Sequence, residues 1–237
     1  MRLESTKVSE TIGQLVMRIR DRFPQSGIFD VCSELQDVAK ETDNIVAGIA
    51  RPIAGVRVAA MLLISAFIAA IVALLLNQDA NEDLSVFSLI QTLEAGGNLL
   101  ILIGLAVIFL WSSEQRVRRA RVIKALNRLR DIAHVVDMKQ LTKDPDGLAQ
   151  VSRPTAHSPK RRLNAFELGR YLDYCTEMLS LVSKLGYLYV AQFHDTEATK
   201  AANELETLCT GLSRKIWQKI MILRGMPDEK KKPTPAA

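Results

Sequence analysis

The sequence predicts an all-α membrane protein in which a two-helix transmembrane hairpin carries a cytoplasmic helical bundle with coiled-coil-like seams. Two long apolar runs predict the hairpin, and apolar residues at helical spacing on both sides of these runs predict the bundle. A connector without Lys or Arg between the runs, followed by a dense group of arginines, predicts the orientation.

Residues 1–52 are predicted to form a cytoplasmic segment of two helices, separated at Pro24 and Gly27. The apolar seam of the first helix consists of Val8, Ile12, Leu15 and Ile19. The seam of the second helix consists of Val31, Leu35, Val38, Thr42, Ile45 and Ile49. These alternating steps of three and four are typical of coiled coils, and Asp30 is the predicted N-cap of the second helix.

Residues 53–76 are predicted to form transmembrane helix 1. A helix of this length extends roughly 36 Å, which is enough to cross a hydrocarbon core of about 30 Å. Arg57 is the one charged residue in the run and lies one turn from its start, so its guanidinium is predicted to reach the lipid headgroups. Residues 1–25 lack the apolar core of a cleavable signal, so the first run is expected to act as an uncleaved insertion signal.

Residues 77–95 are predicted to form a short extracytoplasmic loop, and residues 96–113 are predicted to form transmembrane helix 2. The strictly apolar part, residues 99–111, extends only about 20 Å as a helix, so an interfacial or re-entrant segment is the alternative. The tripeptide Gly96-Gly97-Asn98 differs from the Gly-Met-Asn signature of CorA-type magnesium channels in its middle residue and in preceding the second span. No residues of that family are therefore carried over.

Residues 114–139 are predicted to form a basic cytoplasmic helix that continues from the second span. Its apolar seam consists of Val122, Leu126, Leu129, Ala133 and Val136. Arg116, Arg118, Arg119 and Arg121 are predicted to lie against anionic lipid headgroups, where each basic residue contributes about 1 kcal/mol. Nucleic acid is not an expected partner, because this cluster adjoins a span and aromatic residues make up only 5% of the chain.

Basic residues remain on the cytoplasmic side of a membrane, and the connector between the two apolar runs contains none. Both termini are therefore predicted to be cytoplasmic. The predicted topology and the lack of a transit signal are typical of a multi-pass protein of the bacterial inner membrane, and a eukaryotic membrane is the alternative.

Residues 140–163 contain three prolines and a glycine and are predicted to form a loop, and residues 226–237 are predicted to form a disordered tail. Residues 164–225 between them are predicted to form a cytoplasmic helical hairpin. The seam of its first helix is Leu168, Leu172, Cys175, Leu179 and Val182. The seam of its second helix is Leu205, Leu208, Leu212, Ile216, Ile220 and Leu223. The break falls at His194, with Asp195 or Thr196 as the N-cap.

The apolar stripes of the two cytoplasmic parts need a partner surface, because exposed apolar area costs roughly 25 cal/mol per Å². Both parts could combine into one bundle, or the stripes could be buried across an oligomer. The sequence leaves both alternatives open.

The chain contains no phosphate-binding, dinucleotide-binding, zinc-protease or serine-hydrolase motif, so no enzyme activity and no cofactor are expected. Asp131, His134 and Asp137 lie at steps of three on one helix face, an arrangement that could bind a metal or transfer a proton. A solvated helix end is the preferred interpretation, since metal ligation usually needs more His or Cys. The cysteines have no metal spacing and are predicted to be small core residues: Cys32, Cys175 and Cys209.

The aromatic residues of the predicted helical hairpin include one cluster and one isolated position. Tyr171, Tyr174 and Met178 occupy adjacent helical positions, which favours core packing over a pocket. Trp217 stands among basic residues, and burial within an amphipathic surface is preferred to contact with lipid or a partner.

Together these patterns predict a non-enzymatic two-pass membrane protein. Its cytoplasmic helices would mediate protein interaction, scaffolding or sensing, as a homo-oligomer or with a protein partner. The alternative is an oligomeric pore with two transmembrane helices per subunit, in which Arg57 and the approach at Gly96-Gly97 would be the working parts. An enzyme that uses His134 is the third hypothesis.

Overall fold

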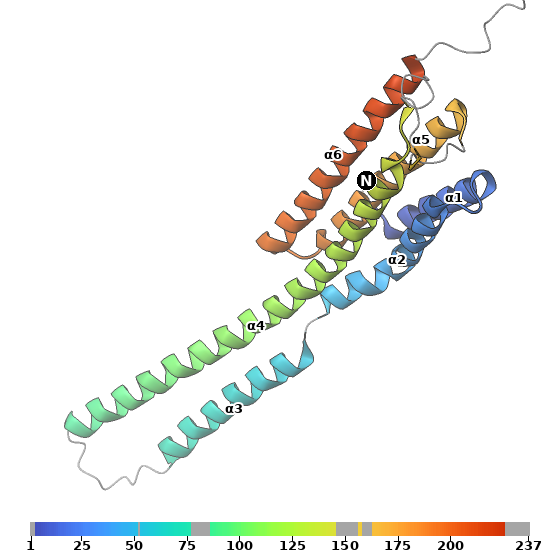
Figure 1. The fold of residues 1–237 in the computed structure, drawn as a ribbon. Helices are drawn as coiled ribbons and strands as arrows, with labels where there is room; N and C mark the ends of the chain where they lie inside the picture. The colour runs from blue at the N-terminus through green and yellow to red at the C-terminus, as the bar shows by residue number, and fades with distance from the viewer. Residues whose placement is uncertain (1–2, 52, 77–85, 146–155, 158–162, 226–237) are drawn as a thin grey trace, which may run out of the picture. The chain divides into compact units, whose positions relative to one another are not determined.

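Six α-helices make up the part of the chain that the computed structural model describes, which is residues 3–51, 53–76, 86–145, 156–157 and 163–225. These residues contain no strand, so the prediction of an all-α fold is confirmed. In chain order (Figure 1) the helices are α1 (Ser5–Arg22), α2 (Gly27–Ala50), α3 (Ala54–Leu76), α4 (Val86–Leu141), α5 (Ala165–Val190) and α6 (Thr196–Gly225).

The chain divides into two compact units. The first, here called the bundle, combines Met1–Gly48 with Val122–Ala237. The second, here called the hairpin, is Ile49–Arg121. Helix α4 contributes its first part to the hairpin and its last part to the bundle.

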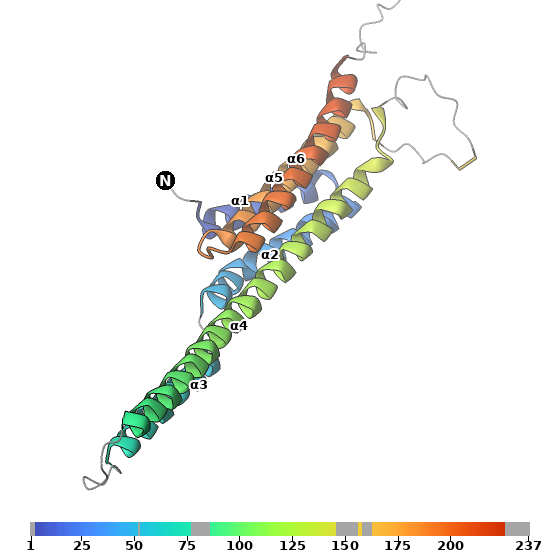
Figure 2. The ribbon, with the colours of Figure 1, turned by 90° about the vertical axis from the view of Figure 1, so that its left-hand side faces the viewer.

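The bundle is assembled from both sides of the apolar segment. Helix α1 packs against α5, and α5 packs along α6 (Figure 2). Two ion pairs connect the last part of α4 to its neighbours: Arg128 to Glu41 of α2 at 2.8 Å, and Arg130 to Glu204 of α6 at 3.4 Å. Of the two alternatives for burying the apolar stripes, the chain therefore uses one bundle formed by both parts.

The core of the bundle follows the predicted seams closely. Every predicted seam residue of α1, of the last part of α4 and of α5 is buried. In α2, Ile45 is only half-buried. In α6, Leu208 and Leu223 are half-buried, whereas the neighbouring Cys209 is buried. The apolar stripe of α6 is thus rotated slightly from the predicted one along part of its length.

The N-termini of three helices can be compared with the capping residues that the sequence predicts. Helix α2 begins at Gly27, so the prediction of Asp30 as its N-cap is wrong. Asp30 instead lies in the first turn, where a carboxylate is favoured by the helix dipole. The backbone amide of Ala198 donates to Asp195 Oδ1 at 2.9 Å, so Asp195 caps α6 as predicted. Helix α5 begins with a capping box between Asn164 and Glu167.

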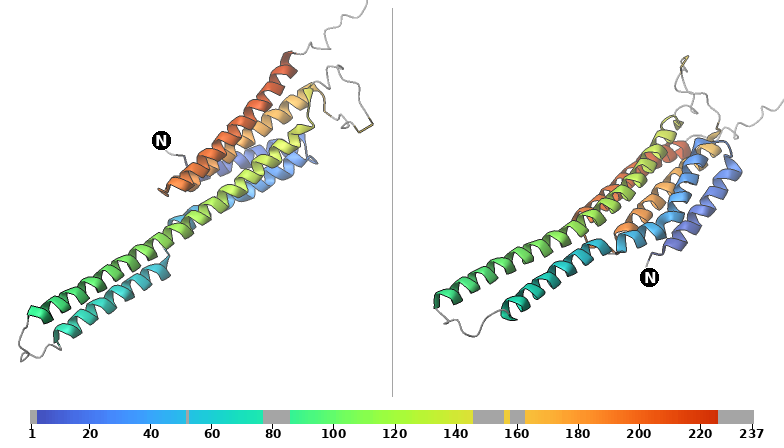
Figure 3. Two further views of the ribbon diagram at one scale, coloured as in Figure 1. Left: turned by 60° about the vertical axis from the view of Figure 1, so that its left-hand side comes forward. Right: turned by 90° about the horizontal axis from the view of Figure 1, so that it is seen from below.

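In the hairpin, α3 and the first part of α4 run antiparallel and side by side (Figure 3). Helix α3 corresponds to predicted span 53–76, but α4 begins at Val86, before the predicted start at residue 96. The sequence predicts a loop over residues 77–95, but residues 86–95 are helical, and residues 77–85 lie outside the described residues. From Val86 to Trp111 the helix extends roughly 38 Å, which is longer than a hydrocarbon core of about 30 Å, although its strictly apolar part is still residues 99–111.

Helix α4 continues without a break to Leu141 and so includes the predicted basic helix 114–139. The described residues between α4 and α5 form no α-helix, and the predicted tail 226–237 lies outside the described residues.

The apolar side chains of the hairpin are exposed on all sides. Leu93 is 79% exposed and Trp111 is 66% exposed. None of the most apolar stretch of either helix is buried within the chain, and both helices are long and apolar enough, by length and composition, to cross a membrane.

Candidate functional site

The candidate site is a cluster of charged residues at the base of the hairpin, where the chain passes from α2 into α3. Because α3 and α4 are antiparallel, the first turn of α3 lies beside the end of the apolar part of α4. Arg57 of α3 and Glu114 of α4 meet there, with Nε 4.0 Å from Oε2. The Glu114 side chain is only 8% exposed, whereas that of Arg57 is 61% exposed.

Glu114 and Arg118, one turn apart on α4, bind the two helix ends at this junction. Glu114 Oε1 accepts a hydrogen bond of 3.4 Å from the backbone amide of Ile53, just before α3. Arg118 Nε donates a hydrogen bond of 2.7 Å to the carbonyl of Ile49 in the last turn of α2. The charges match the helix dipoles, since a helix start favours an anion and a helix end favours a cation.

A cavity of about 240 Å³ adjoins this pair of charges. Its lining consists of Val56, Arg57, Ala60, Val107, Leu110, Trp111 and Glu114. The site therefore combines one cation, one nearly buried anion, an aromatic ring and apolar walls, all within the hairpin.

The predicted headgroup arginines follow directly on α4. Arg116 and Arg121 are exposed, whereas Arg118 and Arg119 are half-buried. Arg118 also contacts the protein, because its Nε donates a hydrogen bond to the backbone carbonyl of Ile49.

The predicted polar stripe of Asp131, His134 and Asp137 does not converge on a common point. Asp131 and His134 are exposed, while Asp137 Oδ1 accepts a hydrogen bond of 2.7 Å from Gln140 Nε2. Within the described ranges, no group of three or more His, Cys, Asp or Glu side chains could hold a metal ion.

A second set of polar contacts lies at the C-terminal end of α4, within the bundle. The amino group of Lys219 on α6 donates to the backbone carbonyls of Gln140 and Lys143, at 3.1 and 3.4 Å, and to Gln140 Oε1 at 2.8 Å. Burial lowers the pKa of Lys219, and the nearby carboxylates Asp144 and Asp137 oppose this shift. An amino group on carbonyls at a helix end is a C-cap supplied by another helix, so the arrangement is structural.

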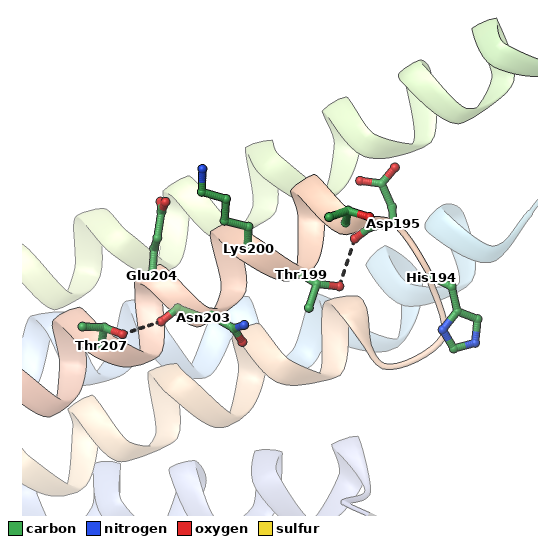
Figure 4. A pocket seen from close by; sticks show the side chains of 8 residues that line it. His194, Asp195, Thr199, Lys200, Asn203, Glu204 and Thr207 are labelled. Carbon is green, nitrogen blue, oxygen red and sulfur yellow. Dashed lines mark hydrogen bonds between the residues drawn. The ribbon is translucent and has the colours of Figure 1, made fainter.

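A groove of about 820 Å³ follows the start of α6 (Figure 4). Its polar lining consists of His194, Asp195, Thr196, Thr199, Lys200, Asn203, Glu204 and Thr207. Several of these groups serve the helix itself: Thr199 Oγ1 donates to the Asp195 carbonyl and Thr207 Oγ1 to that of Asn203, both at 2.9 Å. Because Asp195 caps the helix and Glu204 pairs with Arg130, the groove offers no converging set of reactive groups.

The predicted aromatic cluster lies in the core. Tyr171, Tyr174 and Met178 are all buried, and the Tyr171 hydroxyl donates to the Lys139 carbonyl at 3.3 Å. The preference for a buried Trp217 is wrong: its ring is 51% exposed, and the Arg224 guanidinium lies 5.6 Å from its centre. The seam passes through Ile216 instead, which leaves the next position pointing outward.

The three cysteines are free and buried, in agreement with their predicted role as core residues. Burial raises the pKa of the Cys32 thiol to about 12 and that of Cys209 to about 11, and it also raises the pKa of Cys175. None of them is a reactive thiolate near neutral pH.

Comparison with known protein family models, with curated proteins and with solved structures finds no match to this chain.

The sequence-based reasoning found Arg57 but missed its partner Glu114. A signal was present, because Glu114 is the one acidic residue between Gly96 and Arg130. An isolated acid at the border between an apolar run and a basic run indicates a specific contact. Lys219 carried no comparable signal, since α6 contains many exposed cations.

Proposed function

We propose that this protein is a non-enzymatic two-pass membrane protein, whose hairpin anchors an interaction bundle at the cytoplasmic face of a bacterial inner membrane. The observation that carries the proposal is the difference in burial: the bundle buries its apolar seams, while the hairpin exposes apolar side chains all round. Soluble monomers rarely expose apolar patches larger than a few hundred Å². A bilayer removes that cost.

The distribution of charge supports the orientation. Residues 77–95 contain no Lys or Arg, whereas Arg116 and Arg121 are exposed just after the apolar part of α4. Positive residues near a span tend to remain in the cytoplasm, which supports the proposal that the bundle and both termini lie there. Arg116 and Arg121 would then face anionic headgroups.

A patch on α6 supports the interaction role. This α6 patch consists of Arg214, Trp217, Met221 and Arg224, which share one helix face and are all exposed. Trp, Met and Arg are enriched at protein interfaces. Because two copies of this basic patch would repel each other, the partner that fits it is a different protein with an acidic surface.

Labelling with a membrane-impermeant maleimide tests the topology. We expect Asn81→Cys to be labelled in intact spheroplasts, and Ser180→Cys, on the exposed face of α5, only after permeabilisation. The native cysteines add little background because they are buried. Labelling of Ser180→Cys from outside, or recovery of the protein without detergent, would contradict the proposal.

Photocrosslinking tests the partner. A photoreactive residue in place of Met221 should yield a crosslinked partner rich in Asp and Glu at its contact surface, and Trp217→Ala or Arg224→Ala should abolish the product. Lys215→Ala is the control, because Lys215 is exposed beside the patch but outside its face. A protein that gives no product at any patch position, or only a crosslink to itself, would argue against an acidic partner.

One observation favours a pore as the second candidate. A side chain added at Gly96, Gly97 or Gly104 of α4 would meet nothing within 4 Å in the described structure. Helices of further copies could therefore pack closely against α4 at these glycines. Ion flux through liposomes that contain the reconstituted protein tests the pore hypothesis. Flux that Gly104→Leu abolishes supports a pore, and a correctly inserted oligomer without flux excludes it.

A further inference from the structure

We propose that the cavity at the base of the hairpin binds the headgroup of an ethanolamine phospholipid, with Arg57 on the phosphate and Glu114 on the primary ammonium group. This inference rests on the proposed function, because it needs the hairpin to lie in a bilayer. It adds a specific lipid ligand to what is otherwise a general membrane anchor.

The depth of the site fits a headgroup. Arg57 lies in the first turn of α3, and Glu114 follows the last apolar residues of α4, so both charges sit at the ends of apolar segments. Trp111 lines the same cavity, and tryptophan favours the border between headgroups and hydrocarbon. The remaining walls, formed by Val56, Ala60, Val107 and Leu110, suit the start of an acyl chain.

The state of the two charges leaves room for a ligand. Their closest contact is 4.0 Å, beyond the 2.7–2.9 Å of a charge-assisted hydrogen bond. The Glu114 carboxylate is nearly buried, yet its one described hydrogen bond is a long one of 3.4 Å from the Ile53 amide. A buried carboxylate with such weak contacts favours a further cationic donor.

Charge complementarity selects the headgroup. The exposed Arg57 guanidinium is a planar fork of N–H donors that can bind two oxygens of a phosphate, which every phospholipid carries. Glu114 needs a cation that donates hydrogen bonds. Ethanolamine supplies a primary ammonium group, choline supplies a cation without a donor, and glycerol supplies no cation. The site should therefore prefer ethanolamine over choline, and choline over glycerol.

Quenching of Trp111 fluorescence by brominated lipids tests this preference. In a Trp217→Phe background Trp111 is the one tryptophan, and the full chain is reconstituted into vesicles of phosphatidylcholine that contain a few per cent of brominated phosphatidylethanolamine, phosphatidylcholine or phosphatidylglycerol. We expect brominated phosphatidylethanolamine to quench at about tenfold lower content than brominated phosphatidylcholine, the ratio at the low end of what one hydrogen bond to a charged group provides.

Two variants and a control separate the contributions. Glu114→Gln should abolish the preference for ethanolamine over choline, and Arg57→Gln should weaken quenching by all three lipids in the same proportion. Glu94→Gln, which changes the exposed carboxylate near the other end of the apolar helix, should leave the preference unchanged. Equal quenching by the three lipids in the parent protein, or an unchanged preference in Glu114→Gln, would overturn the inference.

The two levels of failure are distinguishable. Flotation of the vesicles before the measurement shows whether the protein has inserted, and far-UV circular dichroism shows whether each variant is helical. A protein that does not float with vesicles refutes the membrane anchor itself. A protein that floats but shows no lipid preference refutes the headgroup site alone.

Discussion

The bundle and the hairpin use apolar residues in opposite ways. In the bundle these residues form one stripe per helix, and the stripes are buried against each other, as Leu172 of α5 and Leu129 of α4 show. In the hairpin they surround each helix and remain exposed, as Leu102 of α4 shows. The difference shows that the spacing of apolar residues determines which face of a helix is buried in a bundle. A long uninterrupted apolar run is instead typical of a helix that is surrounded by lipid.

The largest expected effect is the loss of a core leucine from the bundle. Leu172→Ala removes a fully buried side chain and should cost about 2–5 kcal/mol of the free energy of unfolding. Leu102→Ala is the matched change in the hairpin, where the side chain is 63% exposed, and it should cost less than about 1 kcal/mol, since lipid or detergent replaces the lost contacts. Urea denaturation of the full chain in detergent micelles, followed by circular dichroism, measures both. Equal losses would mean that the two regions pack alike.

A charged residue at a helical glycine sharpens the comparison further. Gly104 of α4 and Gly211 of α6 are both exposed, and a side chain at either position meets nothing within 4 Å. In water both changes to Arg should be tolerated, since Arg is the better helix former. In a bilayer Gly104→Arg should cost about 3 kcal/mol of insertion free energy, while Gly211→Arg should have no effect. The fraction of protein that resists carbonate extraction measures the difference, and matching fractions would place both glycines in water.

The sequence allowed much of this fold to be predicted, for a physical reason. Seams such as Leu168, Leu172 and Leu179 are local patterns, and burial in a bundle follows directly from them. The sequence does not predict the start of α4 at Val86, because residues 86–95 mix apolar and polar side chains and continue no apolar run. A helix can form there all the same, since its hydrogen bonds join backbone groups.

The candidate site could be predicted only in part. Arg57 is conspicuous as a charge in an apolar run, but its proximity to Glu114 depends on the register between α3 and α4, which no local pattern specifies. The same holds for Lys219, whose carbonyl partners lie on another helix. The outward position of Trp217 depends on the rotation of α6, which the seam determines only to within about one residue.

A smaller effect is expected from the Lys219 cap. Lys219→Met removes hydrogen bonds to the end of α4 and should cost about 1–2 kcal/mol of the free energy of unfolding. Because burial lowers the pKa of Lys219, protonation opposes folding, so the parent protein should gain stability relative to the variant as the pH rises toward 10.5. Lys215→Met, at an exposed position on the same helix, should change stability by less than about 0.5 kcal/mol. Denaturation of the three proteins at pH 7 and pH 10 tests both statements, and a difference between parent and Lys219→Met that falls with pH would contradict the second.

The smallest perturbation is chemical modification of the cysteines, which changes no residue. Thiolate is the reactive form, and burial raises the pKa of Cys32 to about 12 and that of Cys209 to about 11, so the folded bundle should react slowly with iodoacetamide at both pH 8 and pH 10. The unfolded chain should react faster at pH 10, because its thiols ionise near pH 9. Intact-mass spectrometry counts the adducts with and without denaturant. Rapid modification of the folded protein would show that the bundle opens readily and that its cysteines, unlike the exposed side chains of the hairpin, are protected only transiently.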